Sequence, residues 1–422
     1  MKVFKFGGAS VKDAEAIRNV AHILQTQGTS RELLVVVSAM GKTTNALENL
    51  LDDYFAKKDY EKRFREIYDY HINTARALFP EGHPAFEAME RLFVRLRYTL
   101  LHHTRPENYH ESYDQVVAFG ELLSTTLISH FLHASGIQHR WIDARDYIKT
   151  DTTWRKAQVD WAWSEHLIQT GLRPLLETQL LLTQGFIGGA PGGRTTTLGR
   201  EGSDYSAALF AAALNAEDLT IWKDVPGVLN ADPKHYAFAS LFEHLSYRQA
   251  AEMTFYGASV IHPNTIRPLA NKNIPLLVRS FMMPEKTGTR IDAQETALEQ
   301  ACVIRKENQC LMSFSVKDLA FITEERISYV LDACHRLHLK LNLIQNSALS
   351  LSVCFDYRPE YVEELRQLLQ DDFSITYNTK LLLITILNYE PALYEKVRGN
   401  RPVLLQQATR KHIRFLVPMD EA

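Results

Sequence analysis

The chain has 422 residues, of which 45% are hydrophobic and 23% charged, and its formal net charge is −3. This length predicts two or three domains, and the composition is typical of a protein with buried cores. A charge so close to balance argues against nucleic acid or an acidic membrane surface as a partner. No basic segment followed by an apolar one opens the chain, and the longest apolar runs are strand-length. We therefore expect a cytoplasmic protein without a secretory signal or a membrane span.

Metal-binding residue patterns are weak in this sequence. The cysteines stand at positions 302, 310, 334 and 354, so they contain no CxxC pair, and buried thiols in a reducing cytosol are the expected interpretation. His130 and His133 could share a helix face, but the sequence places no third ligand nearby. No protein-bound metal site is predicted.

The first 45 residues predict a strand, a glycine turn, a helix and a second strand. Residues 3–6 and 33–37 are the strand-like runs, and Ser10 is expected to cap the helix between them. At Gly7 and Gly8 the backbone N–H groups and the helix N-terminus could bind anionic oxygens, toward which Lys5 would point. A glycine pair alone is weak evidence, and the spacing of a Walker loop is absent.

Further along, residues 46–135 look mainly helical, and strand-like runs return at 180–183 and 219–222. Between those runs lie two glycine-rich loops and an alanine-rich helix that ends near residue 215. Repeated strand, loop and helix predict an α/β sandwich with a mostly parallel sheet. Its substrate site is expected at the carboxyl ends of the strands.

Polar residues follow two of these later segments. Arg200 offers a planar fork that suits a carboxylate, and Asp204 is either a helix cap or a functional acid, with equal weight on each. Lys223 and Asp224 stand in a turn after a strand, where a purely structural turn is the equal alternative.

The C-terminal third has a different pattern. Residues 291–300 are interpreted as a linker, and alternating strands and helices then predict two β-α-β-β-α-β units, at 301–372 and, shortened, at 373–422. This part has no glycine-rich catalytic turn, so we expect it to serve regulation or dimerisation.

Taken together, the segments resemble the aspartate kinase family, whose motifs they match in the same order. The resemblance covers the first 290 residues, and the remainder resembles the family's paired ACT domains. It implies an amino acid kinase-type α/β sandwich with a mainly parallel central sheet at 1–290, followed by ferredoxin-like (α+β) ACT domains. The matching segments are residues 5–11 (KFGGASV), 38–45 (SAMGKTTN), 120–121, 184–187 with 193–204, 224–227 with 231–233, and 257–263.

The resemblance implies an enzyme that uses ATP to phosphorylate the β-carboxylate of L-aspartate, giving 4-phospho-L-aspartate on the way to lysine, threonine and methionine. Magnesium would be carried by the ATP phosphates. An aspartate side chain with a pKa of about 3.9 is already ionised at neutral pH, so no general base is needed. The implied catalytic residues are Lys5 and Asp204; the substrate residues are Ser38, Thr44, Glu121, Arg200 and Ser203; the nucleotide residues are Lys5, Gly7, Gly8, Lys223, Asp224, Leu229, Lys234 and Ser259.

The sequence departs from the family pattern at four places. Ala9 replaces a threonine, and Glu201 replaces a glycine beside an anion site. Ser259 stands where the family has a lysine for the nucleotide phosphates, whereas Lys223 replaces a threonine. We hypothesise that Lys223 restores the positive charge that is lost at position 259.

The partners implied are L-aspartate, ATP, a second copy of the chain through the ACT domains, and an amino-acid effector. Asn342 stands where lysine-sensitive members tend to carry an aspartate, so feedback by lysine is the weaker expectation. The length leaves no room for a fused homoserine dehydrogenase. Two alternatives stay open: a kinase for glutamate or N-acetylglutamate, and an inactive effector-binding protein.

Overall fold

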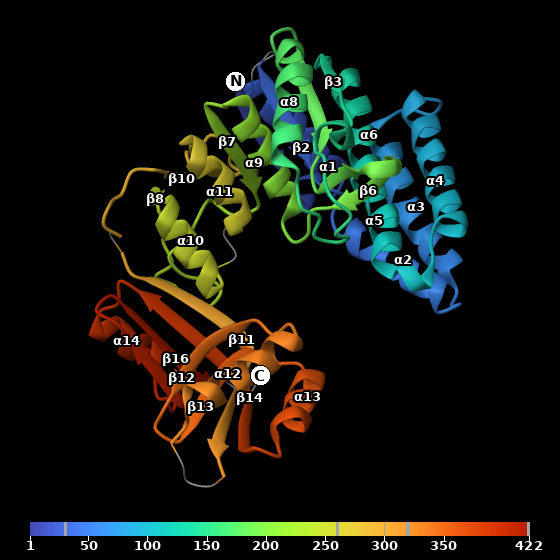
Figure 1. The fold of residues 1–422 in the computed structure, drawn as a ribbon. Coiled ribbons are helices and arrows are strands. Elements are labelled where there is room, and N and C mark those ends of the chain that lie inside the picture. The colour runs from blue at the N-terminus through green and yellow to red at the C-terminus, as the bar shows by residue number, and fades with distance from the viewer. Residues whose placement is uncertain (29–31, 259–260, 299, 318–320, 420–422) are drawn as a thin grey trace. The chain divides into compact units, whose positions relative to one another are not determined.

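The computed structural model describes residues 1–28, 32–258, 261–298, 300–317 and 321–419 (Figure 1). The chain forms two compact units. The first comprises residues 1–228, 241–251 and 260–296, and the second comprises 229–240, 252–259 and 297–422. The domain boundaries predicted from the sequence remain predictions, but two short segments from the predicted kinase region group with the C-terminal part.

The first unit is built on an eight-stranded sheet with the order β3-β4-β2-β1-β7-β9-β10-β8. The strands from β3 to β9 in this order are parallel to their neighbours, whereas β10 runs antiparallel to β9. A mostly parallel sheet was predicted, and the structure confirms it. The strands are β1 (Lys2–Phe6), β2 (Leu33–Val37), β3 (His139–Trp141), β4 (Leu180–Gln184), β7 (Asp218–Lys223), β8 (His244–Ser246), β9 (Leu276–Ser280) and β10 (Thr289–Asp292).

Helices cover both faces of this sheet. On one face α9 contacts β1, β2 and β7 and packs between α8 and α11, and on the other α6 contacts β2, β3 and β4 and also α1 (Figure 1). The central strands β1 and β2 are almost wholly buried, as expected for a sheet covered on both sides. These helices are α1 (Ala14–Thr26), α6 (Phe119–Ala134), α8 (Trp161–Leu176), α9 (Gly202–Leu214) and α11 (Pro263–Lys272).

A group of helices extends from α6, in blue and cyan in Figure 1. It consists of α2 (Thr43–Phe55), α3 (Tyr60–Leu78), α4 (Pro84–His102) and α5 (Tyr109–Val117). Among the described residues, the stretch Pro106–Ala134 is long and apolar enough to cross a membrane by composition alone, but 78% of its most apolar window is buried in the fold. It has the character of a core helix. The remaining elements of the first unit are α7 (Ala144–Tyr147), the hairpin β5 (Ile187–Ala190) and β6 (Arg194–Thr197), and the first half of α10 (Tyr247–Tyr256).

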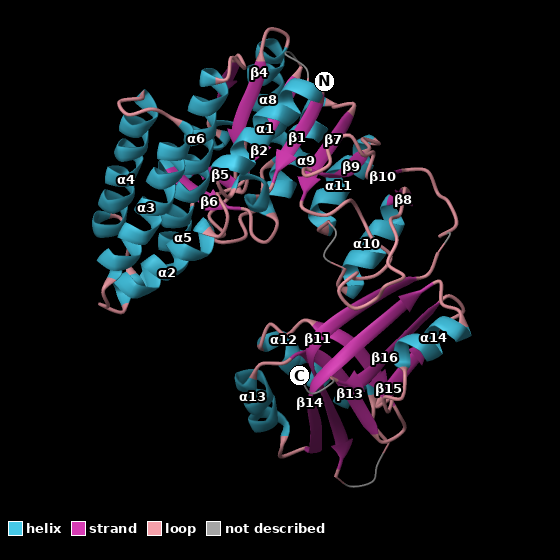
Figure 2. Ribbon diagram, turned by 180° about the vertical axis from the view of Figure 1, so that it is seen from behind, coloured by secondary structure: helices cyan, strands magenta, loops and turns pink. Residues whose placement is uncertain are grey.

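The second unit is a six-stranded antiparallel sheet with the order β12-β13-β11-β14-β16-β15 (Figure 2). The run β11-α12-β12-β13-α13-β14 forms a complete ferredoxin-like unit. Its four strands lie side by side in the sheet in the order β14-β11-β13-β12, which is the order of that fold. Its elements are β11 (Cys302–Val316), α12 (Glu324–Arg336), β12 (Leu341–Asn346), β13 (Ser350–Asp356), α13 (Pro359–Leu369) and β14 (Phe373–Leu387).

The other half of this sheet uses parts of the same long strands. The end of β14 continues into α14 (Pro391–Arg398), β15 (Leu405–Ala408) and β16 (His412–Pro418). Its remaining strand is the beginning of β11, where Cys302 pairs with Leu387. Tyr236 and Phe238, from the segment 229–240, pack on the core of this half. A single helix and that segment thus cover the side chains of the shortened half.

One local prediction was wrong. Ser10 does not cap the first helix, because residues 8–11 form a short 3₁₀ turn and α1 begins after Asp13, whose carboxylate accepts the N–H of Ala16 at 2.8 Å. The buried Ser10 hydroxyl instead donates to the carbonyl of Trp222 at 3.2 Å. Serine and aspartate are both favoured caps, because the side chain of each can accept a backbone N–H, and in this chain Asp13 takes that position.

Candidate active site

A cleft of about 650 Å³ lies at the carboxyl ends of β1, β2 and β7 in the first unit. This is the edge of a parallel sheet at which ligands of α/β proteins bind. The cleft brings together most of the predicted site residues, although they come from segments far apart in the sequence. Those that line it are Lys5, Gly7, Gly8, Ser38, Thr44, Glu121, Arg200, Ser203, Asp204, Lys223 and Asp224.

Lys5 and Asp204 form the charged centre of the cleft. The Lys5 Nζ lies 2.5 Å from one oxygen of Asp204, and the Lys223 Nζ lies 3.9 Å from the other. Burial opposes ionisation of Asp204, but the two ammonium groups outweigh it and hold the pKa of that carboxyl below its usual value. Asp204 lies inside the first turn of α9 and not at its cap, so the structure does not support the capping interpretation.

The glycine turn after β1 is tightly packed against the turn after β2. A Cβ on Gly8 would lie 2.8 Å from the carbonyl oxygen of Gly41 and 3.0 Å from that of Ala39. The N–H of Gly41 also donates to the carbonyl of Gly8 at 3.0 Å. Only glycine allows this approach, which leaves the backbone of the first turn at the edge of the cleft.

Glu121 is a buried carboxylate with one unsatisfied oxygen. Its Oε1 accepts the N–H of Ala39 at 3.1 Å, whereas its Oε2 has no hydrogen-bond partner. Burial raises the pKa of Glu121 to about 8, although the Ala39 N–H and the Lys5 ammonium act in the opposite direction. A carboxylate of this kind is suited to a cationic ligand that would satisfy the second oxygen.

The loop before α9 carries Arg200 and Glu201. Arg200 is exposed, so its side chain can contact a ligand in the cleft without a rearrangement of buried residues. Glu201 adopts a left-handed backbone, with φ at 53°, which is costly for a residue with a Cβ. The replacement of a glycine by Glu201 left the geometry of this loop open, and the glutamate adopts the glycine-like backbone conformation.

Three predicted nucleotide residues are not part of this cleft as described. Leu229 and Lys234 belong to the second unit. Ser259 lies outside the described residues. Their roles remain predictions.

The cleft also contains residues that were not among the predicted site residues. They are Ala9, Ser10, Ala39, Gly41, Asn45, Tyr113, Arg155, Lys156, Phe186, Gly199, Glu201, Gly202 and Trp222. Those inside the recognised motifs are Ala9, Ser10, Ala39, Gly41, Asn45, Phe186, Gly199, Glu201 and Gly202. Tyr113, Arg155 and Lys156 stand in no motif, and no local pattern marks them.

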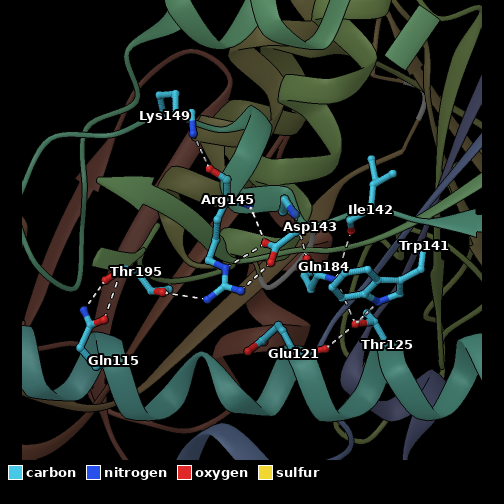
Figure 3. Close-up of polar contacts among 11 residues, drawn as sticks. Gln115, Glu121, Thr125, Trp141, Ile142, Asp143, Arg145, Lys149, Gln184 and Thr195 are labelled. Atoms are coloured by element: carbon cyan, nitrogen blue, oxygen red, sulfur yellow. Dashed lines mark hydrogen bonds and ion pairs between the residues drawn. The ribbon is translucent and has the colours of Figure 1, made fainter. Parts of the chain in front are cut away.

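A polar network supports the helix that carries Glu121 (Figure 3). One turn along α6, Thr125 donates to the carbonyl of Glu121 at 2.8 Å and accepts the amide of Gln184 at 3.1 Å. Gln184, at the end of β4, in turn accepts the N–H of Ala144 at 2.8 Å. These bonds fix α6, β4 and α7 relative to one another and so fix the place of Glu121.

Among the described residues, no group of three or more His, Cys, Asp or Glu side chains could hold a metal ion. His130 and His133 are both on α6, but they belong to a cluster of aromatic contacts with His83 and His139. The four cysteines are buried and unpaired with one another, and burial raises their thiol pKa values.

Residues 1–280 match the model of the amino acid kinase family. The chain is 34% identical over 361 residues to "Lysine-sensitive aspartokinase 3" of Escherichia coli, covering 84% of this chain and 78% of that protein. It is 29% identical to the "Aspartokinase" of Chlamydia trachomatis, covering 99% of this chain and 94% of that protein. It spans about a third of the length of bifunctional aspartokinase/homoserine dehydrogenases such as one from Zea mays, with 34% identity and coverage of 71% of this chain and 33% of that protein.

The fold is similar to solved structures of E. coli aspartokinase III. The complex of that protein with aspartate and ADP matches 99% of this chain and 96% of its own, with a TM-score of 0.79 and 28% identity. Its complex with lysine and aspartate has the same coverage, with a TM-score of 0.80. These matches extend over both units, each of which therefore has a counterpart in the solved structures.

Proposed function

The chain belongs to the aspartokinases of the amino acid kinase family and has their activity, ATP-dependent phosphorylation of L-aspartate; we propose here how the cleft residues perform it. The observation that carries the proposal is the presence in one cleft of the Lys5–Asp204 ion pair and the unsatisfied carboxylate of Glu121. The first suits a phosphoryl group and the second suits an ammonium. A substrate that carries both an ammonium and a nucleophilic carboxylate would connect the two.

On the amino-acid side, Glu121 pairs with the α-ammonium and Arg200 with the α-carboxylate. Ser203, Ser38 and Thr44 line the same cleft and hold the remaining oxygens. The β-carboxylate then points at the γ-phosphorus of ATP. It is already an anion at neutral pH, so the protein has to position it and neutralise the repulsion between two anions, and no proton needs to be removed.

On the phosphate side, the Lys5 ammonium and the backbone at Gly7 and Gly8 hold the β- and γ-phosphates. In transfer, charge spreads over the γ-phosphate oxygens, and a fixed ammonium stabilises that charge. Asp204 keeps Lys5 in place. Lys223 and Asp224 at the end of β7 take the nucleotide, and we retain Leu229, Lys234 and Ser259 as proposed contacts of it.

Magnesium enters this proposal as part of the ATP substrate. It prefers oxygen ligands and usually binds through one or two carboxylates together with phosphates. Asp204 and the exposed Asp224 supply carboxylate oxygens at the cleft. Bound there, the ion would screen the phosphate charges, while Asp204 would still position Lys5.

The activity is tested with purified protein, L-aspartate, MgATP and hydroxylamine, which traps an acyl phosphate as a hydroxamate. Formation of aspartyl hydroxamate that depends on both substrates is the expected result. Activity with glutamate or N-acetylglutamate in place of aspartate would contradict the substrate assignment. No hydroxamate with any of them would support an inactive effector-binding protein.

Lys223 gives a separate prediction on the nucleotide side. Changing Lys223 to threonine is expected to raise the KM for ATP about tenfold, because an ammonium facing phosphates is lost, and to leave the KM for aspartate within about twofold. In that variant, Ser259→Lys should recover most of the loss if the two positions share one role. Steady-state kinetics with each substrate varied in turn measures this. An unchanged KM for ATP in the first variant would remove Lys223 from the site.

The second unit is proposed to form a homodimer and to bind an amino-acid effector. Its ferredoxin-like half is complete, and its edge strand β12 exposes Ile344. The Asn342 side chain is neutral and already bonded, to Lys306 at 2.7 Å and to Gln309 at 2.7 Å, which makes lysine the least favoured of the candidate effectors. Light scattering gives the oligomeric state, and assays with lysine, threonine and methionine identify the effector. We also propose a cytoplasmic location and a product used for those three amino acids.

A further inference from the structure

We propose that Arg155 is a substrate-binding residue that takes the α-carboxylate of aspartate together with Arg200, and that Asp114 is the residue that positions it. The proposal rests on the proposed function of the cleft. It concerns a residue in the irregular segment between α7 and α8, which none of the recognised motifs includes.

The backbone of Arg155 is in a conformation that a residue with a Cβ rarely adopts. Its φ is 66°, in the left-handed region. Among the described non-glycine residues with positive φ, Arg155, Phe186 and Glu201 all line this one cleft. Such conformations persist only where the surroundings impose them, and they gather at functional sites.

Asp114 is the group that imposes it. This carboxylate on α5 is wholly buried, and both of its oxygens accept the N–H of Arg155, at 3.2 and 3.0 Å. The same carboxylate accepts the N–H of Thr197 at 3.0 Å and its hydroxyl at 2.7 Å. Thr197 ends β6, which leads directly into the loop of Arg200, so one buried acid fixes both arginine-bearing segments.

The neighbouring residue on α5 continues this attachment (Figure 3). The Gln115 amide donates to the carbonyl of Thr195 at 2.7 Å and accepts its N–H at 3.1 Å. Thr195 also receives a bond from Arg145, at 3.1 Å. Since β5 is the one strand that pairs with β6 among the described residues, the side chains of α5 take the place of a second neighbouring strand.

The Arg155 side chain lines the cleft and is held there by an aromatic ring and a carboxylate. Its guanidinium lies 4.0 Å from the centre of the Tyr113 ring, and one nitrogen is 2.7 Å from the carboxylate of Glu48. Glu48 is one turn along α2 from Thr44, a proposed substrate residue. The bond to Glu48 uses one of the five N–H donors of a guanidinium, and the group is still 35% exposed.

The charge of the substrate favours a second guanidinium in the cleft. Aspartate brings two carboxylates, and the one that reacts must turn toward Lys5 and the phosphates. Arg200 is exposed, so a carboxylate held by it alone would remain largely in water. A second guanidinium, stacked and already oriented by an acid, gives a planar, partly desolvated site, in which charge-assisted bonds are stronger.

The competing interpretation is structural: Arg155 would merely tie its loop to α2 through Glu48. The two interpretations differ in what happens when the substrate lacks the α-carboxylate. The test therefore compares L-aspartate with its α-amide, L-isoasparagine, which keeps the α-ammonium and the β-carboxylate. The amide is measured as a competitive inhibitor of aspartate, so its binding is read whether or not it is phosphorylated.

Arg155→Ala is expected to raise the KM for aspartate roughly 10- to 100-fold with little change in the KM for ATP. Its inhibition constant for the α-amide should change less than about threefold. Arg155→Lys keeps the charge without the fork, so its KM for aspartate should lie between those of the wild type and Arg155→Ala. Asp114→Asn should also raise the KM for aspartate, but by less than Arg155→Ala does. These two variants also carry the test if Arg155→Ala does not fold.

Arg194→Ala is the matched control. Arg194 likewise lies over an aromatic ring, that of Trp154 at 5.2 Å, and pairs with an acid of α5, Glu111 at 3.3 Å, but it does not line the cleft. The Arg194→Ala variant should keep the KM for aspartate and the inhibition constant for the α-amide within about twofold of the wild-type values. If Arg155→Ala weakened the binding of aspartate and of the amide equally, or weakened neither, the inference would be overturned. A wild type that makes no aspartyl hydroxamate would instead reject the proposed function.

Discussion

Replacing Lys5 by alanine is expected to lower kcat/KM for aspartyl phosphate formation by at least about 10³-fold, with most of the loss in kcat. The ammonium is buried beside Asp204 and points into the cleft next to the glycine turn. It neutralises charge that grows on the γ-phosphate oxygens during transfer, and a group that acts on developing charge affects kcat more than binding. Hydroxamate formation measured at saturating substrates gives kcat directly.

The variant leaves Asp204 with Lys223 as its neighbouring cation, at 3.9 Å, so some loss of stability accompanies the loss of activity. Thermal unfolding of the variant separates the two effects. The control is Lys2→Ala, because Lys2 is on the same strand and also pairs with an aspartate, Asp218 at 3.6 Å, but it does not line the cleft. That variant should keep activity within about twofold. A Lys5→Ala protein within tenfold of the wild type would mean that the phosphates bind elsewhere.

The sequence predicted the sheet and the glycine turn because their signals are local. Continuous apolar runs at 33–37 and 180–183 mark strands buried on both faces, and a glycine pair after such a strand marks a turn at its carboxyl end. Asp204 could not be resolved in this way. An acid in the first turn of a helix has the same local pattern whether it caps or acts, and only the contact of α9 with β1 places it against Lys5.

Arg155 and Asp114 illustrate what the sequence could not reveal. Asp114 is one acid in the interior of an amphipathic helix, and nothing local distinguishes it from a solvated one. Its burial, and the burial-driven rise of its pKa to about 6, exist only because β6 and the loop of Arg155 pack on α5. The shared long strands β11 and β14 were missed for a related reason, since pairing across two ferredoxin-like halves is decided by tertiary register.

Changing Glu121 to glutamine is expected to raise the KM for aspartate roughly 10- to 100-fold, because the amide can no longer pair with the α-ammonium as an ion. Succinate lacks that ammonium, so its inhibition constant should be nearly the same in the variant and the wild type. The wild-type KM for aspartate should also fall as pH rises toward about 8, the pKa of Glu121, whereas the variant should lack this dependence.

The same substitution should stabilise the protein, and this sets it apart from damage to the fold. The pKa of Glu121 is raised from the usual 4.5 to about 8 by burial, so the folded state binds the proton more tightly than the unfolded state. The wild type therefore loses stability as pH rises between those two values, and a neutral glutamine avoids that loss. The Tm of Glu121→Gln minus that of the wild type should be small at pH 5 and should increase toward pH 8. A lower Tm at pH 8 with an unchanged KM for aspartate would show that the buried carboxylate is structural and does not bind the ammonium.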